Sequence, residues 1–81
     1  MAAQQILVID EGTTSTRAML FDVDGKLRGS QQEALQQYYP APGLVEHDAA
    51  EIWEKTLSCC QKMIDQAGGA DKISAIGITN Q

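Results

Sequence analysis

The sequence predicts an α/β domain whose elements follow the order β-β-β-α-β and whose sheet is mixed. Three features support this prediction: an unbroken apolar run near the N-terminus, an Asp-Gly pair typical of a tight hairpin, and one long amphipathic segment in the second half. A helix that joins two strands of one sheet nearly always brings the new strand in parallel and right-handed. We therefore expect the first and last strands to point the same way.

The first three strands form a predicted meander. Residues 5–10, QILVID, are apolar without alternation, which is the pattern of a strand covered on both faces. Residues 16–22, TRAMLFD, form the second strand, and the Asp-Gly pair at 24–25 favours a hairpin because such turns require positive φ. Residues 26–36 are more polar and predict an edge strand, with a bend or bulge at Gly29.

The second half predicts a loop, a helix and a fourth strand. Both prolines lie within residues 36–48, which we expect to be a loop. Asp48, with Glu51 three residues later, predicts a capping-box start to the helix, which should end at the glycine pair 68–69. Its expected apolar stripe consists of Ile52, Trp53, Leu57, Cys60, Met63, Ile64 and Ala67. Residues 72–81, KISAIGITNQ, then predict a strand covered on both faces.

The predicted layers are incomplete. A sheet with strands buried on both faces needs a layer on each side, and the sequence offers a single helix. We therefore expect residues 1–81 to be the N-terminal part of a larger domain. An uncovered sheet face and an open sheet edge also predict that the chain self-associates.

Composition and charge argue against several kinds of partner. The 81 residues are 43% hydrophobic and 21% charged, which is ordinary for a soluble protein. A net charge of −5 argues against nucleic acid and anionic membranes, and no apolar run approaches the ~20 residues of a membrane helix. The N-terminus shows no secretory signal, and the adjacent pair Cys59 and Cys60 would form a strained bridge on a helix. These features predict a cytoplasmic protein.

The segment at 8–20, VIDEGTTSTRAML, is the most informative part of the sequence. Asp10 ends a buried strand, where a carboxylate needs a partner, and is a candidate for holding Mg²⁺ directly or through water. Gly12 lets the backbone approach a ligand, and Arg17 can reach phosphate oxygens or bind Asp10. The candidate hydroxyl and amide donors to phosphate are Thr13, Thr14 and Ser15. The alternative is an ordinary hairpin with a surface ion pair.

The stretch DEGTTSTRA resembles the first phosphate motif of the superfamily that contains actin, Hsp70 and the sugar kinases. YYPAPGLVEHDAAEIW and AIGITNQ resemble N-terminal segments of the FGGY carbohydrate kinase family. This resemblance implies a partial ribonuclease H-like fold and, in the intact protein, transfer of the γ-phosphoryl of MgATP to glycerol by a homo-oligomeric enzyme. The alternatives are an FGGY kinase for another polyol or a ketose such as xylulose, and a non-catalytic nucleotide-binding module of the actin and Hsp70 type.

The resemblance also assigns roles by motif position. It makes Asp10 the Mg²⁺-linked carboxylate and Arg17 the contact to ADP, while Gly12 and the three hydroxyl residues after it approach the nucleotide phosphates. Glu11 departs from the family, in which glutamine is frequent; its charge would weaken nucleotide binding or face solvent. None of the family's catalytic residues falls within residues 1–81, and an Arg-Glu pair that binds the polyol is expected directly after GITNQ. We therefore expect the 81-residue chain to be inactive as a kinase.

Overall fold

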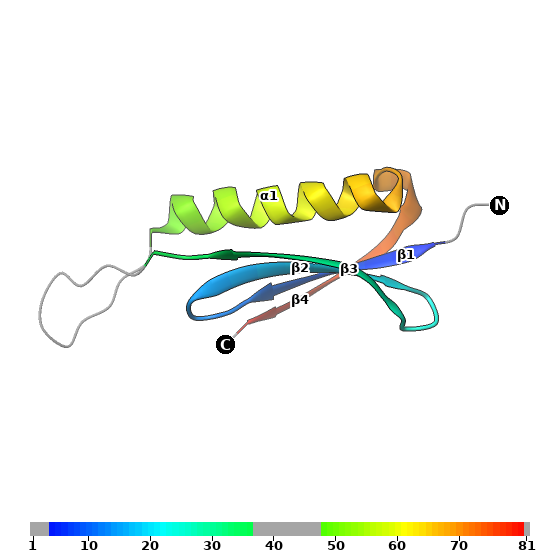
Figure 1. Ribbon diagram of the computed structural model, residues 1–81, viewed down its shortest axis with the longest axis horizontal. Helices are drawn as coiled ribbons and strands as arrows, with labels where there is room; N and C mark the ends of the chain where they lie inside the picture. Colours follow the sequence, from blue (N-terminus) through cyan, green and yellow to red (C-terminus); the bar gives the residue numbers. More distant parts are fainter. Residues whose placement is uncertain (1–3, 37–47, 81) are drawn as a thin grey trace, which may run out of the picture.

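The computed structural model describes residues 4–36 and 48–80, which form a mixed four-stranded sheet with one helix packed against it (Figure 1). The elements are β1 (Gln5–Glu11), β2 (Ser15–Asp22), β3 (Leu27–Ala34), α1 (Ala49–Ala67), a short 3-10 turn η1 (Ala70–Lys72) and β4 (Ile73–Asn80). The predicted order β-β-β-α-β is confirmed. Most of the predicted loop at 36–48 lies outside the described residues.

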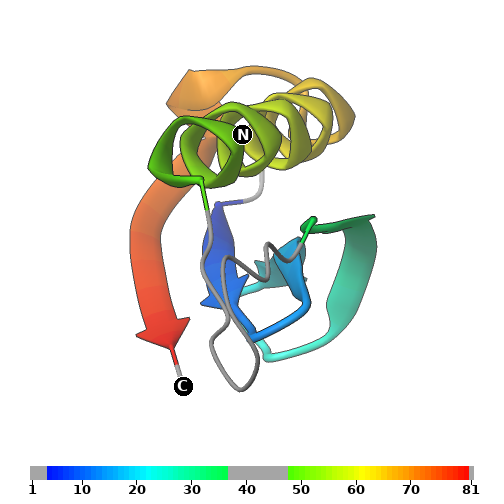
Figure 2. The same ribbon diagram turned by 90° about the vertical axis from the view of Figure 1, so that its left-hand side faces the viewer.

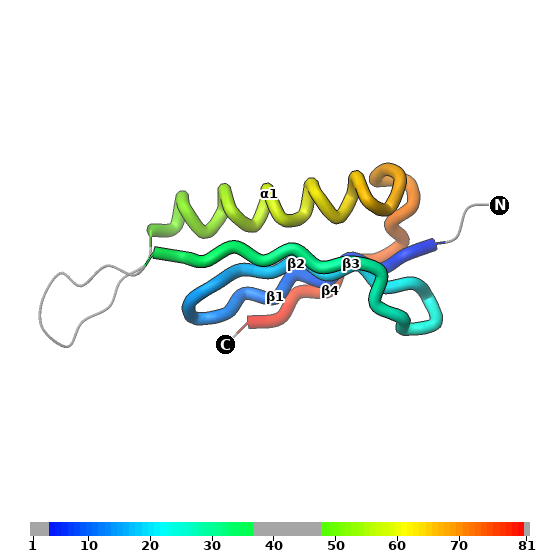
Figure 3. Tube along the Cα trace, in the orientation of Figure 1, coloured from blue at the N-terminus to red at the C-terminus, as the bar shows by residue number. Residues whose placement is uncertain are grey.

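The strand order across the sheet is β3-β2-β1-β4. Strands β1, β2 and β3 pair antiparallel, whereas β4 pairs parallel with β1, as the crossover through α1 requires. Asp10 pairs with Thr79 and Glu11 with Asn80, so the C-terminal ends of β1 and β4 lie side by side at the same end of the sheet (Figure 3). The β1–β2 turn also lies at this end, and open α/β sheets tend to bind ligands at the C-terminal ends of their strands.

The β2–β3 hairpin turns through Gly25, whose φ of 89° is in the left-handed region. The Gly25 amide donates to the Asp22 carbonyl at 2.9 Å, and the Asp22 amide donates to the Lys26 carbonyl at 3.0 Å. The ladder then shifts register by skipping Arg28, which lies next to Gly29. The predicted bulge is therefore confirmed, and β3 is an edge strand as expected.

Helix α1 begins and ends at the predicted residues. The Asp48 carboxylate accepts the Ala50 amide at 2.9 Å, and Gly68 ends the helix with a φ of 101°. Glu51 does not complete the expected capping box; its carboxylate accepts the amide of Gln36 at 3.0 Å. The buried core between helix and sheet consists of Leu7, Ala18, Leu20, Cys59, Cys60 and Met63.

The predicted apolar stripe of α1 is wrong at two positions, because Trp53 is 64% exposed and Leu57 is 47% exposed. The helix packs mainly on β2 and β3 and contacts few residues of β4. Figure 2 shows β4 descending at one side of the sheet, away from the helix. For the same reason Ile76 and Ile78 of β4 are exposed, although that strand was expected to be covered on both faces. Among residues 4–36 and 48–80, no helix has the length and apolar character to cross a membrane.

Candidate phosphate-binding site

The β1–β2 turn is closed tightly by its own backbone. The Gly12 amide donates to the Ser15 carbonyl at 2.9 Å, and a Cβ on Gly12 would lie 3.1 Å from that oxygen. The Thr14 carbonyl accepts the Leu35 amide at 2.8 Å, which ties the turn to the residue after β3. A side chain at position 12 would therefore crowd the turn, and glycine fits for this reason as well as for access to a ligand.

A pocket of about 250 Å³ lies over this turn. It is lined by Asp10, Gly12, Thr13, Thr14, Ser15, Arg17 and Gln32. The structure thus brings together all six residues that the sequence singled out for metal and phosphate binding, and it adds Gln32. Pockets for whole small-molecule ligands usually occupy ~300–1,000 Å³. A pocket of this size suits phosphate groups, and an adenosine would extend beyond it.

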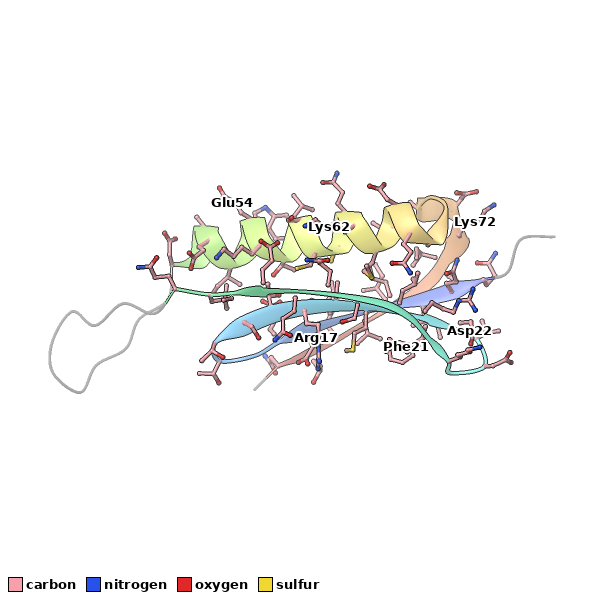
Figure 4. All side chains as sticks on the ribbon, viewed as in Figure 1. Arg17, Phe21, Asp22, Glu54, Lys62 and Lys72 are labelled. Carbon is pink, nitrogen blue, oxygen red and sulfur yellow. The ribbon has the colours of Figure 1, made fainter. Side chains whose placement is uncertain are left out.

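Asp10 and Arg17 lie on the face of the sheet opposite to α1. They are direct cross-strand partners, and Arg17 Nη2 donates to Asp10 Oδ2 at 2.9 Å. Figure 4 shows Arg17 pointing to this open side together with Phe21. The Arg17 Nε atom is buried and has no hydrogen-bond partner within the described part of the chain. Arg17 therefore holds Asp10 and still has donor capacity for an anion in the pocket.

Gln32 is the pocket residue that the sequence reasoning missed. Its Nε2 donates to Ser15 Oγ at 2.7 Å, and it pairs with Arg17 across the β2–β3 ladder. The alternation of side chains along β3 would have placed Gln32 on the same face as Arg17 once the hairpin register was known. That register could not be counted from the turn, however, because the sequence does not reveal that the ladder skips Arg28.

Glu11 points to the opposite face from Asp10, because successive side chains of a strand alternate. Its Oε1 atom accepts the Thr16 hydroxyl and, at 3.0 Å, the Thr56 hydroxyl of α1. Glu11 does not line the pocket. The expectation that Glu11 simply faces solvent is therefore wrong, because its carboxylate binds two hydroxyl groups beneath the helix. The effect of its charge on nucleotide binding stays a prediction.

The pocket lining offers one carboxylate, that of Asp10, as a possible ligand for a magnesium ion. Within residues 4–36 and 48–80, no group of three or more His, Cys, Asp or Glu side chains could hold a metal ion. Mg²⁺ in nucleotide sites commonly keeps several waters and uses one or two carboxylates together with phosphate oxygens. Asp10 can serve as such a contact, directly or through water, if phosphate and water provide the remaining ligands.

The fold and the site together place the chain in the actin-like class of domains: a mixed β-β-β-α-β sheet carries a hydroxyl-rich, glycine-led turn where the parallel strands β1 and β4 end. Residues 5–81 match the N-terminal domain of the FGGY family of carbohydrate kinases, and the chain belongs to this family.

Relatives at the sequence level are glycerol kinases. The chain is 53% identical over 77 residues to the glycerol kinase of Trichlorobacter lovleyi, an alignment that covers 94% of this chain and 16% of that enzyme. It is 52% identical over 80 residues to the glycerol kinase of Xanthobacter autotrophicus, covering 98% of this chain and 16% of that enzyme. The chain thus spans about one sixth of the length of the curated relatives that it matches.

Solved structures show the same fold. Plasmodium falciparum glycerol kinase with ADP superposes with a TM-score of 0.84 at 31% identity, covering 98% of this chain and 16% of that one. Gluconate kinase from Lactobacillus acidophilus gives a TM-score of 0.89 at 25% identity, with the same coverage of both chains. The predicted fold class, part of the ribonuclease H-like domain of these kinases, is confirmed.

Proposed function

We propose that the chain supplies the N-terminal part of the nucleotide phosphate site of an ATP-dependent glycerol kinase. The intact enzyme would transfer the γ-phosphoryl of MgATP to a terminal hydroxyl of glycerol and give sn-glycerol 3-phosphate. The observation that supports this most directly is the pocket over the β1–β2 turn, in which a glycine, three hydroxyl side chains, an arginine and a carboxylate converge. Residues 1–81 would form the first part of the first FGGY domain, in a cytoplasmic protein.

Each group in the pocket has a role that its chemistry suits. Thr13, Thr14 and Ser15 would donate hydrogen bonds to phosphate oxygens, and the Arg17 guanidinium would offset their negative charge. Asp10 would hold Mg²⁺, which when bound would neutralise negative charge on the phosphates during transfer. Phosphoryl transfer depends mostly on positioning and charge neutralisation. The chain offers part of both, so we expect no kinase activity from the 81 residues alone.

Glycerol is the substrate best supported by similarity. The relatives at about 50% identity are glycerol kinases, and the glycerol kinase structure at 31% identity contains ADP. A xylulose kinase from Lactobacillus acidophilus superposes well, with a TM-score of 0.88, but at 26% identity. Backbone similarity at that level supports the shared fold more than a shared substrate.

A graft tests the proposed phosphate site. This chain replaces the matching N-terminal segment of the Trichlorobacter lovleyi enzyme, and ATP-dependent phosphorylation of glycerol is measured. We expect the graft to be active and the Asp10→Asn graft to lose at least about tenfold in kcat, since the pocket's carboxylate contact to Mg²⁺ is removed. Asp24→Asn is the matched control, because it removes the same charge at the β2–β3 hairpin.

The graft has clear negative outcomes. A folded graft that turns over no ATP with glycerol would contradict the proposal. Equal activity of the Asp10→Asn and unmodified grafts would show that the pocket does not hold the metal and phosphates as proposed. A large loss in the Asp24→Asn graft would attribute the effect to folding and not to the pocket.

A further inference from the structure

The phosphate-binding turn has a second set of contacts behind it, on the face of the sheet that α1 covers. Glu11 and Thr16 are the last cross-strand pair before the turn and form its base. Thr16 is fully buried, and its hydroxyl donates to Glu11 Oε1. The Thr56 hydroxyl of α1 donates to the same oxygen at 3.0 Å and lies 3.0 Å from the Thr16 hydroxyl. One carboxylate oxygen thus joins the base of the turn to the middle of the helix.

The contacts of this cluster are consistent with a charged acceptor. A carboxylate oxygen has two acceptor positions and no donor of its own, so it can accept both threonine hydroxyls. Hydrogen bonds to a charged group are stronger than neutral ones, particularly where water is partly excluded. The β1–β2 ladder already pairs Glu11 with Thr16. What the cluster adds is the connection to Thr56, and hence to a different element of the fold.

We propose that Glu11 is a positioning residue of the phosphate site, acting through Thr16 and Thr56 to fix the turn formed by residues 12–15 against α1. Glu11 touches no ligand in this scheme, because it points away from the pocket. Its importance for phosphate binding rests on the function proposed above. The mechanical part of the proposal is that contacts with α1 fix the position of the turn, and it does not depend on any ligand. A movement of α1 along its axis would shift the turn with it.

Hydrogen exchange measured by NMR on the 81-residue chain tests the mechanical part. The reporter is the Gly12 amide, which donates within the turn to Ser15. In Thr56→Val we expect this amide to exchange about tenfold faster, since the base of the turn loses a hydrogen bond to a charged group. The Leu20 amide belongs to a buried core residue of β2, so it reports opening of the whole sheet and should be affected much less.

Three further variants separate positioning from general stability. Glu11→Gln keeps an acceptor oxygen at the same place but removes its charge, so its Gly12 amide should exchange at a rate between those of the unmodified chain and Thr56→Val. Glu11→Met removes the acceptor, and its Gly12 amide should exchange as fast as in Thr56→Val. Ser58→Ala removes a hydroxyl from the same helix, about 200° around its axis from Thr56, and should leave the turn unchanged. Equal acceleration of the Gly12 and Leu20 amides would overturn the proposal, and so would an unchanged Gly12 amide.

Titration with inorganic pyrophosphate and Mg²⁺ links the cluster to the site. We expect Thr56→Val to weaken binding about threefold to tenfold relative to Ser58→Ala, because a looser turn must be ordered on binding. If the unmodified chain binds pyrophosphate and Thr56→Val binds it equally well, the positioning role is contradicted. If the unmodified chain binds no pyrophosphate, the proposed function of the turn is contradicted, while the exchange data still decide whether α1 holds the turn.

Discussion

Replacing Asp10 by Asn should change phosphate binding in opposite directions with and without Mg²⁺. In the structure the Asp10 carboxylate binds Arg17 at 2.9 Å, and both side chains line the pocket. Without metal, the carboxylate repels phosphate and occupies part of the guanidinium. With metal, it is the pocket's candidate Mg²⁺ contact. Asn keeps the shape and removes the charge.

The size of the effect follows from Coulomb's law. Two unit charges about 6 Å apart, at an effective dielectric constant of about 60, interact by about 1 kcal/mol. Removing the carboxylate should therefore strengthen metal-free pyrophosphate binding about fivefold. The stability cost should be small: the Arg17 and Asp10 side chains are 41% and 25% exposed, and pairs near the surface contribute about 0.2–1 kcal/mol.

Isothermal titration of the unmodified and Asp10→Asn chains with pyrophosphate, in EDTA and in excess Mg²⁺, measures both effects. We expect Mg²⁺ to enhance binding by the unmodified chain and to have little effect on the variant. Urea unfolding of both chains provides the stability control. An Asp10→Asn chain that binds pyrophosphate more weakly by the same factor in both buffers would refute the reasoning, because it would make Asp10 a structural residue and not the metal contact.

Three more outcomes follow from packing and burial. Burial, together with the nearby Glu33 carboxylate, raises the pKa of the Cys59 thiol to about 11 from about 9 in the unfolded chain. The protonated thiol therefore contributes its full stabilisation below pH 9, and this contribution is lost as the pH rises through 11. Urea midpoints should fall across this range, and they should fall less in Cys59→Ala. Gly68→Ala should cost about 1–2 kcal/mol in the same assay, because φ is 101° at a position where the space for a Cβ is otherwise adequate. We also expect concentration-dependent self-association in sedimentation, weakened by Ile78→Lys at a side chain that is 73% exposed on edge strand β4; a single monomeric species at all concentrations would contradict this expectation.

Much of the fold could be predicted because local patterns determined it. The Asp48 side chain caps the start of the helix, and Gly68 ends the helix with a left-handed φ. Gly25 provides the positive φ that the β2–β3 hairpin requires. The topology then followed from the helical crossover, which makes β4 parallel to β1 and brings its end beside Asp10. These features depend on neighbouring residues and general geometric rules, so the sequence carries them directly.

The errors arose where an outcome depended on elements far apart in the chain. The spacing of Trp53 and Leu57 indicates an apolar stripe, but burial depends on how much of the sheet the helix covers. The direction of Glu11 depended on where β1 ends, because one residue of difference reverses the face. Its partner Thr56 lies 45 residues away and matches no motif, so a hydroxyl on the helix gave no signal that it would contact the turn.

The pairing of β1 with β4 also has a consequence for the order of folding. The β1–β2 and β2–β3 hairpins close over short chain separations, whereas β1 and β4 join residues about 70 positions apart. Non-local contacts carry the greater loop-closure entropy, so the hairpin with the β1–β2 turn can form early and the parallel strand joins later. During synthesis from the N-terminus, the turn would emerge and close before β4 exists. The parallel strand, and with it the other half of the site edge, would then dock onto an already formed template.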